Sequence, residues 1–315
     1  MKLSEEFDLI GIGAANVDLI VKIEDFPKLD EEVKILNIQF HGGGSAANVV
    51  TGASRLGLKT GFIGNIGKDY FGEFLMKEFE KEQVDASKVN IIEGESSGLA
   101  LCIVNKLGER VIMVYGGANS KLSSSNIDEN YLKKTKALFL SSVEGPKALE
   151  AMEYACENAG DAAIFFDPGC LFASKGLNAL KKIISYSTIV KVNEVELKML
   201  TNEENIVKGA EKIKSLGPKI VLVTLGSEGC YALSDEKEFK TPSFPQFKPI
   251  DKTGAGDSFN AGFLTGFLKG WSLEKAVKFG NLIASISITK LGARSTPSLN
   301  ELRNYSEAKE FLSAW

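Results

Sequence analysis

Between Ala137 and Thr224 the sequence repeatedly alternates a short apolar run with a longer segment that has the apolar spacing of a helix. This alternation favours a parallel sheet with helices on both faces, because consecutive parallel strands need a crossover connection. It constrains the chain to an α/β fold. The expected strands are Ala137–Ser141, Ala163–Asp167, Ile189–Val192 and Ile220–Thr224, and the expected helices are Pro146–Asn158, Leu177–Ser185, Glu194–Leu200 and Ile206–Leu216.

The N-terminal part predicts one more unit of this kind and a separate small sheet. A buried strand, Phe7–Gly13, is followed by a helix, Ser45–Leu56, and by a second strand, Thr60–Gly64. Two alternating stretches, Val17–Ile23 and Val33–Phe40, predict exposed, half-buried strands. Two β-rich runs, Gly98–Val104 and Arg110–Tyr115, are joined by NKLGE, which predicts a hairpin with Gly108 in the turn and completes the small sheet.

No internal repeat, low-complexity tract or Pro/Gly-rich linker divides the 315 residues. We therefore predict a single domain, residues 1–315, with a small β-sheet lid formed from about residues 14–42 and 97–116. Hydrophobic residues make up 44% of the chain and charged residues 25%, which is typical of a soluble globular protein.

Charge and composition exclude several classes of function. The net charge of −4 comes without a basic block, which argues against nucleic acid as the main partner. No apolar window is long enough to span a membrane, and the acidic start MKLSEEFD is unlike a signal peptide, so we expect a cytoplasmic protein that acts on a small molecule. Four scattered cysteines and a single histidine, His41, leave base catalysis to carboxylates.

Glycines and polar residues stand where the expected strands end. The carboxyl ends of parallel strands meet at one edge of a sheet, and ligands bind at that edge. The binding site should therefore lie along it. The residues at these ends are Gly11, Gly13, Gly64, Asp167, Asn193 and Gly226.

The run DKTGAGD, residues 251–257, leads directly into an apolar segment that suits a buried helix. Backbone N–H groups of Gly254, Ala255 and Gly256 at a helix N-terminus form a site for a phosphate, and small side chains allow its close approach. Asp257 stands inside this anion site. It is either a helix cap or a base that accepts the proton of an attacking hydroxyl while the amides stabilise the transferred phosphoryl group.

Several ordered motifs resemble the PfkB or ribokinase-like family of carbohydrate kinases over nearly the whole chain. Asp251–Leu264 is similar to the family's carboxy-terminal signature, D-T/P-T-G-A-G-D-x-F-x-A-G-F. GGGSAANVVTGASRLG, Gly42–Gly57, resembles its amino-terminal signature, and GNIGKDYFG, Gly64–Gly72, resembles a third stretch. The resemblance implies a three-layer α/β/α fold with a mostly parallel sheet and a small β-sheet lid. It also implies an ATP-dependent kinase that phosphorylates a primary hydroxyl of a small sugar, most closely ribose.

Residue by residue, the resemblance makes Asp257 the catalytic base and Gly254, Ala255 and Gly256 the anion hole. Short acids, amides and glycines suit a polyol, because they supply donors, acceptors and close backbone approach. The same residue types are also common in turns and caps. The substrate-binding residues that the resemblance implies are Asn16, Asp18, Gly43, Gly44, Asn48 and Glu144.

The resemblance also implies a nucleotide site and two cation sites. Asn193 and Glu196 in VNEVE match an N-x-x-E motif that positions Mg²⁺ and phosphates, largely through water; a solvated helix face is the alternative for Glu196. VTLGSEGC resembles the nucleotide-side T-x-G-x-x-G segment. It places Thr224, Gly226 and Gly229 near ATP, together with Gly256 and Asn281. Asp251 and Thr253 are similar to the K⁺ loop of ribokinases.

Three local features bear on the cation and on the substrate. Lys252 stands where the family usually has a small residue, and this positive charge counts against K⁺. FDPGCLF lacks the arginine of the D-P-N-x-R motif, which makes acidic sugars less favoured. YGGAN, Tyr115–Asn119, is similar to the GAN stretch of ribokinases and favours a ribose-containing substrate.

Alternatives to a sugar kinase remain open. A nucleoside kinase for adenosine, cytidine or inosine shares the fold and the ribose 5-hydroxyl. A non-catalytic sugar- or nucleotide-binding protein should have lost Asp257 or its glycines, and GIGAAN departs from a dinucleotide fingerprint at Asn16. Exposed lid strands also predict a homodimer formed through the lid sheets.

Overall fold

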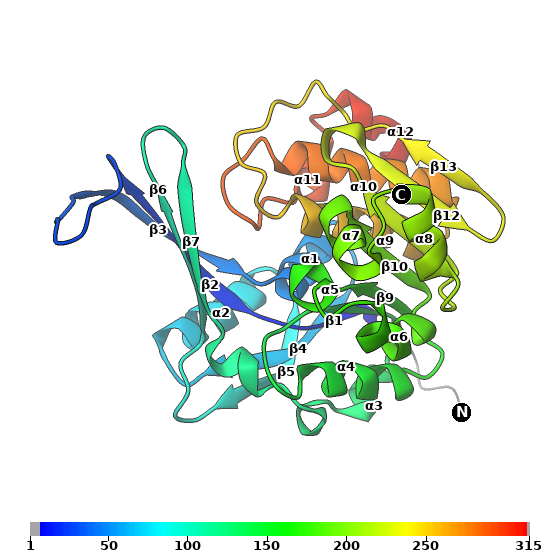
Figure 1. Cartoon of the computed structure of the whole chain (residues 1–315), viewed down its shortest axis with the longest axis horizontal. Helices are drawn as coiled ribbons and strands as arrows, with labels where there is room; N and C mark the ends of the chain where they lie inside the picture. The colour runs from blue at the N-terminus through cyan, green and yellow to red at the C-terminus, as the bar shows by residue number, and fades with distance from the viewer. Residues whose placement is uncertain (1–6, 314–315) are drawn as a thin grey trace.

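The computed structural model describes residues 7–313 and contains a large central sheet and a separate smaller one (Figure 1). The nine-stranded sheet has the order β13-β12-β11-β10-β9-β8-β1-β4-β5. All neighbouring pairs from β11 to β5 are parallel, and β12 and β13 extend the sheet in antiparallel fashion. Its strands are β1 Phe7–Ile12, β4 Thr60–Gly67, β5 Asp85–Ile92, β8 Thr135–Ser141, β9 Ala163–Asp167, β10 Ile189–Asn193, β11 Ile220–Thr224, β12 Cys230–Ser234 and β13 Glu238–Thr241.

Two layers of helices cover the central sheet, because its strands are apolar on both faces. In β8, Phe139 packs into one hydrophobic cluster and Leu138 and Leu140 pack into the other. The first cluster includes residues of α1 Ser45–Arg55, α2 Tyr70–Lys81, α9 Ala255–Leu268, α10 Leu273–Ser287, α11 Leu299–Leu302 and α12 Lys309–Leu312. The second includes residues of α3 Glu129–Leu132, α4 Ala148–Glu157, α5 Gly169–Ala173, α6 Leu177–Tyr186, α7 Glu194–Thr201 and α8 Ile206–Lys214.

The predicted three-layer α/β/α class is thus confirmed, with a few differences in the elements. The helix predicted from Pro146 begins at Ala148. Strand β5 was not predicted, because this edge strand, DASKVNII, has only partly buried residues and no clean alternation. The antiparallel pair β12 and β13 was also missed.

The smaller sheet has the order β3-β2-β6-β7 and extends away from the helical layers at the left of Figure 1. Its strands are β2 Asn16–Ile23, β3 Ile35–Gly43, β6 Gly98–Val104 and β7 Arg110–Tyr115. All four strands that the alternating stretches and the β-rich hairpin predicted are therefore present in one sheet. The register sets Asn16 opposite both Gly43 and Gly98, and it sets Asp18 opposite His41.

A cluster of hydrogen bonds joins the small sheet to the central one. Asp69 caps α2 by accepting from the Gly72 N–H at 2.8 Å. The same carboxylate accepts from the Ser97 N–H at 2.8 Å and from the Ser97 hydroxyl at 2.7 Å, and Ser97 directly precedes β6. The GNIGKDYFG motif therefore anchors the base of the small sheet to the end of β4.

Among the described residues no helix is long and apolar enough to cross a membrane.

Candidate active site

The GAG loop begins helix α9 and depends on the glycine at its N-cap. Gly254 has a φ of 76°, and a Cβ there would lie 2.2 Å from the Ala293 carbonyl oxygen, so a larger residue would not fit. The Ala255 N–H donates to Lys252 O at 3.3 Å, whereas the N–H groups of Gly254 and Gly256 have no acceptor within residues 7–313. These two unpaired N–H groups and the helix N-terminus suit an anion.

Asp257 lies in the first turn of α9 and faces the first turn of α1. Its Oδ1 accepts from the Ser45 hydroxyl at 2.7 Å, and its Oδ2 accepts from the Asn48 amide at 2.9 Å. Burial raises the pKa of Asp257 to about 6, although both hydrogen bonds act in the opposite direction. A base with this pKa is largely ionised at neutral pH and close enough to it to accept a proton.

Asp18 forms a second carboxylate at the same place. A Cβ on Gly43 would lie 2.1 Å from Asp18 Oδ1, so only a glycine at position 43 leaves room for the Asp18 side chain. Burial raises the pKa of Asp18 to about 6; the nearby Arg294 opposes this shift and the negative charge of Asp257 adds to it. Two carboxylates with raised pKa values thus lie at one end of the small sheet.

Arg294 donates hydrogen bonds to two residues of this arrangement. Its Nε donates to Asn48 Oδ1 at 3.1 Å and its Nη2 donates to Gly43 O at 3.3 Å. The guanidinium also lies over the ring of Phe79, 5.5 Å from the centroid. Neither Arg294 nor Ser45 was predicted as a site residue. Arg294 is 246 positions from Asn48, so only the folded structure reveals the contact.

Asn16 lies at the start of β2, where Asn119 fixes it. The Asn119 amide donates to Asn16 Oδ1 at 2.8 Å, and its own carbonyl oxygen accepts from the Ala15 N–H at 3.0 Å. Gly44, with a φ of 90°, begins α1, and a Cβ on it would lie 2.3 Å from Ala14 O. Glu144 is exposed and lies against Gly116 at the end of the small sheet, outside the lining of the cleft described next.

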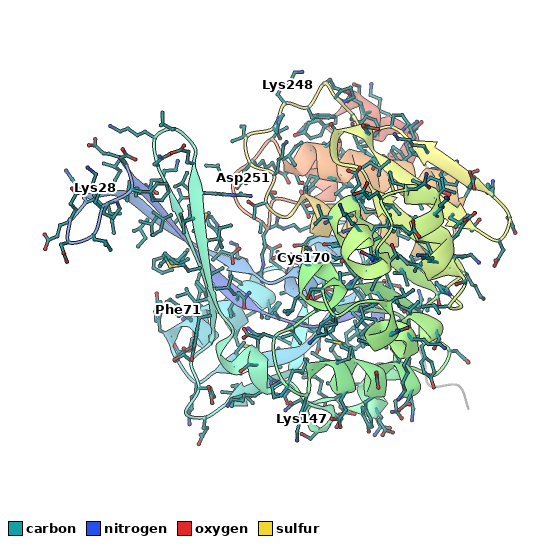
Figure 2. All side chains as sticks on the ribbon, viewed as in Figure 1. Lys28, Phe71, Lys147, Cys170, Lys248 and Asp251 are labelled. Atoms are coloured by element: carbon teal, nitrogen blue, oxygen red, sulfur yellow. The ribbon has the colours of Figure 1, made fainter. Side chains whose placement is uncertain are left out.

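A cleft of about 500 Å³ lies between the inner face of the small sheet and the loop that precedes α9. In Figure 2, Asp251 is on that loop, on the side that faces the small sheet. The cleft is lined by polar and aliphatic side chains, and none of its lining residues is aromatic. These residues include Asp18, Ile20, Gln39, Cys102, Arg110, Ile112, Asp251, Lys252 and Thr253.

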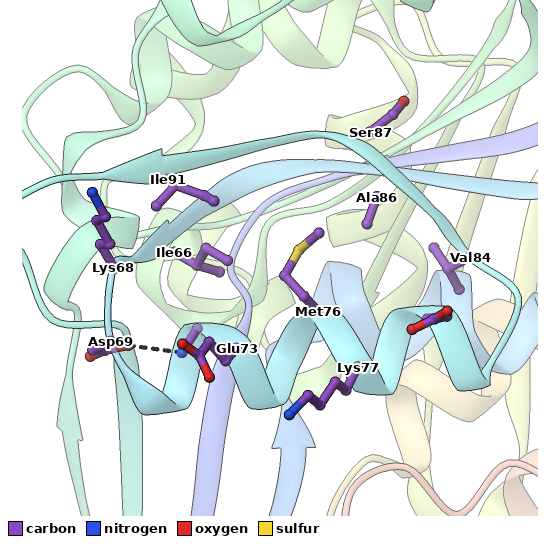
Figure 3. Close-up of a pocket in the computed structure, with 13 residues that line it drawn as sticks. Ile66, Lys68, Asp69, Glu73, Met76, Lys77, Val84, Ala86, Ser87 and Ile91 are labelled. Atoms are coloured by element: carbon purple, nitrogen blue, oxygen red, sulfur yellow. Dashed lines mark hydrogen bonds between the residues drawn. The ribbon is translucent and has the colours of Figure 1, made fainter.

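A second hollow, of about 720 Å³, lies between α2 and β5 (Figure 3). Ile66, Met76 and Val84 line its apolar part, and Lys68 and Glu73 lie near its rim. None of the predicted site residues lines this hollow. The groups that suit phosphoryl transfer are gathered instead around the first turns of α1 and α9.

The residues predicted for the nucleotide side come together around the ends of three strands. Thr224 ends β11 and pairs with Cys230 of β12, which pairs with Thr241 of β13. The Asn281 amide on α10 donates to Thr241 O at 3.0 Å and to Pro242 O at 3.1 Å. Asn281 therefore links this edge of the sheet to α10. Gly226 and Gly229 form the turn between β11 and β12, both with positive φ.

Asn193 and Glu196 form the capping box of α7. The Asn193 side chain accepts from the Glu196 N–H at 2.9 Å, and Glu196 Oε2 accepts from the Asn193 N–H at 2.8 Å. Glu196 is buried, so the alternative that it lies on a solvated helix face is wrong. Burial raises the pKa of Glu196. Residues 7–313 contain no group of three or more His, Cys, Asp or Glu side chains that could hold a metal ion.

The predicted K⁺ loop is held by internal hydrogen bonds. Asp251 Oδ1 accepts from the Thr253 N–H at 2.9 Å and from its hydroxyl at 2.7 Å, and Oδ2 accepts from the Gly292 N–H at 3.0 Å. Arg110 of β7 reaches the same place. It donates to Thr253 Oγ1 at 3.1 Å and lies 4.0 Å from Asp251 Oδ1. A guanidinium therefore competes with a bound cation for this carboxylate.

A helix N-terminus with unpaired N–H groups, a carboxylate in its first turn and a polar cleft near that carboxylate suit phosphoryl transfer. The pfkB family carbohydrate kinases match residues 7–300, and the chain belongs to this family. It is thus an ATP-dependent sugar kinase.

Individual relatives agree with this assignment. An uncharacterized sugar kinase of Archaeoglobus fulgidus is 38% identical over 246 residues, which cover 77% of this chain and 96% of the relative. A ribokinase of Haemophilus influenzae is 31% identical over 305 residues, covering 94% of this chain and 97% of the relative. The crystal structure of a ribokinase from Thermotoga maritima superposes with a TM-score of 0.84 at 30% identity, covering 98% and 99% of the two chains.

The raised pKa of Asp18 predicts a stability cost at neutral pH. A carboxyl that binds its proton more tightly when folded stabilises the protein below about pH 4, and this contribution is lost as pH rises through about 6. We expect Asp18→Asn to raise the free energy of unfolding by about 1–3 kcal/mol at pH 8 and by much less at pH 4. Urea titrations at both pH values would measure this, with the exposed Asp25→Asn as control. Equal or lower stability of Asp18→Asn at pH 8 would contradict the expectation.

Proposed function

We propose that this kinase transfers the γ-phosphoryl group of ATP to a primary hydroxyl of ribose or a closely related sugar, with Asp257 as the base. The observation that carries the proposal is the position of Asp257. Its carboxylate lies in the first turn of α9, beside the unpaired N–H groups of Gly254 and Gly256 and near Asp18. A proton acceptor, an anion site and a ligand for sugar hydroxyls are thus next to one another.

The contacts of Asp257 suggest how it acts. Each carboxylate oxygen accepts one hydrogen bond from α1, which fixes the orientation of the group and leaves further lone pairs for a substrate hydroxyl. Asp257 takes the hydroxyl proton as the oxygen attacks the phosphorus in line, and the N–H groups of the GAG loop stabilise charge on the transferred group. Asn16, Asp18, Gly43 and Asn48 bind the other sugar hydroxyls in this proposal.

The nucleotide would lie on the opposite side of the GAG loop. Thr224, Gly226, Gly229 and Asn281 gather at the edge of the sheet beside α10, and they form the proposed ATP-binding residues. Mg²⁺ would neutralise the phosphates, positioned through water by Glu196. Gly44 and Glu144 stay in the proposed substrate set on the strength of the family resemblance.

The cleft favours a sugar over a nucleoside. A nucleoside kinase has to bind a base, and bases commonly stack on aromatic rings. The described residues that line the 500 Å³ cleft include no such ring, and their apolar part is mostly aliphatic, with Ile20, Ala100, Val104, Ile112, Ile250 and Leu291. A nucleoside kinase of the same fold is the second candidate.

A panel of acceptors separates these two candidates. We expect ATP consumption with ribose or another small sugar, and much slower consumption with adenosine, cytidine or inosine, because the cleft offers no platform for a base. The assay would contain Mg²⁺ and K⁺ and would also include fructose and other hexoses. Faster turnover of a nucleoside than of any sugar would replace the first candidate by the second.

Substitution of the base tests the mechanism. We expect Asp257→Asn to fold normally and to lose at least about a hundredfold in kcat, since a positioned acid or base contributes that much or more. Steady-state rates with the preferred acceptor would be compared with those of Asp161→Asn, a variant at an exposed aspartate outside the proposed site. Near-normal turnover of Asp257→Asn would exclude Asp257 as the base, whereas absence of turnover by the natural protein with every acceptor of the panel would favour a non-catalytic binding role.

Activation by K⁺ at Asp251 and Thr253 is a separate part of the proposal. Arg110 already provides positive charge next to Asp251, so we expect modest activation in the natural protein and stronger activation in Arg110→Ala. Rates in KCl and in tetramethylammonium chloride would be compared for both proteins. Equal rates in the two salts for both proteins would dismiss the K⁺ site.

A homodimer through the small sheets completes the proposal. The outer face of this sheet exposes large apolar side chains on β3 and β7, and an exposed apolar sheet face is a common interface. The exposed residues of these two strands that alternate with the cleft-lining ones, and so lie on the outer face, are Ile35, Ile38, Phe40, Val111, Met113 and Tyr115. A monomer at micromolar concentration in sedimentation experiments would contradict this arrangement.

A further inference from the structure

Lys191 is a buried cation that the mechanism above does not use. It interrupts the apolar strand β10, and its side chain is only 5% exposed. Side chains alternate along a strand, so Lys191 points to the same face as Ile189, whereas Val190 and Val192 pack in the opposite layer. The face of Ile189 and Lys191 is the one that α9 covers.

Asp167 of β9 holds the ammonium in place. Phe165 pairs with Ile189 in the sheet register, so Asp167 and Lys191 lie opposite each other two residues further along the strands. The Lys191 Nζ donates to Asp167 Oδ2 at 3.0 Å, and the Asn260 amide of α9 donates to the same oxygen at 2.7 Å. Asp167 Oδ1 accepts from the Gly169 N–H at 3.1 Å. The pair is therefore tied directly to α9.

The ammonium lies against the GAG loop. A Cβ on Gly256 would be 3.3 Å from Lys191 Nζ, so the absence of a side chain at this position leaves room for the cation. Apart from the bond to Asp167, the described part of the chain provides no acceptor for the Lys191 ammonium. A positive charge thus stands beside the first turn of the helix that carries Asp257.

Carboxylates from three elements surround this cation. Burial opposes the charged form of Lys191, yet Asp167 of β9, Glu196 of α7 and Asp257 of α9 together raise its pKa. Cys170 of α5 and Cys230 of β12 are the other titratable groups near it. Without Lys191, three carboxylates and the phosphates of ATP would lie in one region, and β10 would provide no positive charge to offset them.

We propose that Lys191 is a positioning residue for phosphoryl transfer, which keeps a fixed positive charge against the GAG loop and thereby sets the ionisation of Asp257. The inference rests on the proposed role of Asp257 as base. Asp167 acts in the opposite direction, because its negative charge disfavours a second ionised carboxylate nearby. The pKa of Asp257 agrees with both directions. Burial is the main cause that raises it, Asp167 raises it further, and Lys191 lowers it.

The proposal predicts opposite effects of the two partners on the titration of Asp257. In Lys191→Met the pKa of Asp257 should rise by about one pH unit or more, and in Asp167→Asn it should fall by a similar amount. The ¹³C carboxyl resonance of labelled aspartate, assigned by its absence in Asp257→Asn, reports this titration directly. The measurement needs no turnover, so it remains decisive even if the proposed substrate is wrong.

Kinetics supply the second readout. The acidic limb of the pH profile of kcat/KM should move in the same directions, since this limb reports the base in the free enzyme. Lys191→Met should lower kcat/KM at pH 6 by about fivefold or more and should have little effect above about pH 8, because a larger fraction of Asp257 is then protonated at pH 6 and cannot accept the hydroxyl proton. Lys191→Arg should retain the natural titration of Asp257.

Two further variants guard against a purely structural explanation. Lys191→Met leaves the buried Asp167 carboxylate without its cation, so it is the variant most at risk of unfolding. Comparing Asp167→Asn with the double variant Asp167→Asn/Lys191→Met shows the effect of the ammonium alone, because both proteins lack that carboxylate. The pKa of Asp257 should be higher in the double variant than in Asp167→Asn. Lys182→Met, which removes an exposed lysine of α6, is the matched control. The proposal would be overturned if the pKa of Asp257 were the same in the double variant as in Asp167→Asn. It would also be overturned if Lys191→Met and Asp167→Asn shifted this pKa in the same direction.

Discussion

The contact between the first turns of α1 and α9 is the interaction on which the rest of the site depends. Ser45 and Asn48 donate to the two oxygens of Asp257 across more than two hundred residues of sequence. Both helices point their N-termini, with their partial positive charge, at the same place. This arrangement stabilises one carboxylate and prepares the same region for the negative charge of a phosphoryl group.

The central sheet explains why these distant segments meet. Its strands are apolar on both faces, so helices from the two ends of the chain must pack side by side to cover one face. Helix α9 is apolar almost all round and lies in the middle of this layer, in contact with both α1 and α10. The buried surface thus fixes the position of the base, and the glycines at the helix starts let backbone and substrate approach it.

Local pattern predicted much of this. The alternation of strands and helices gave the layered fold, and the glycine-rich run before an apolar helix indicated both the anion site and Asp257. Arg294, Ser45 and the pair of Lys191 with Asp167 were not predicted, because each matters through a partner far away in sequence. Strand β5 and the pair β12 and β13 lie at the sheet edges, where solvent weakens the apolar pattern. Asn119 was noticed only as part of a motif, and the fold shows that it fixes the start of β2.

The small sheet is joined to the main body through few points, among them the Asp69–Ser97 hydrogen bonds and the clamp of Asn119 on Ala15 and Asn16. Half of the residues that line the cleft lie on strands of this sheet, whereas Asp257 and the GAG loop lie at the start of α9. The strands of the sheet all end before residue 116, and α9 begins at Ala255. If the cleft binds the acceptor as proposed, substitutions on β2, β6 and β7 would change which acceptor is admitted without altering the first turn of α9, so one catalytic body could be inherited by enzymes that serve different metabolites.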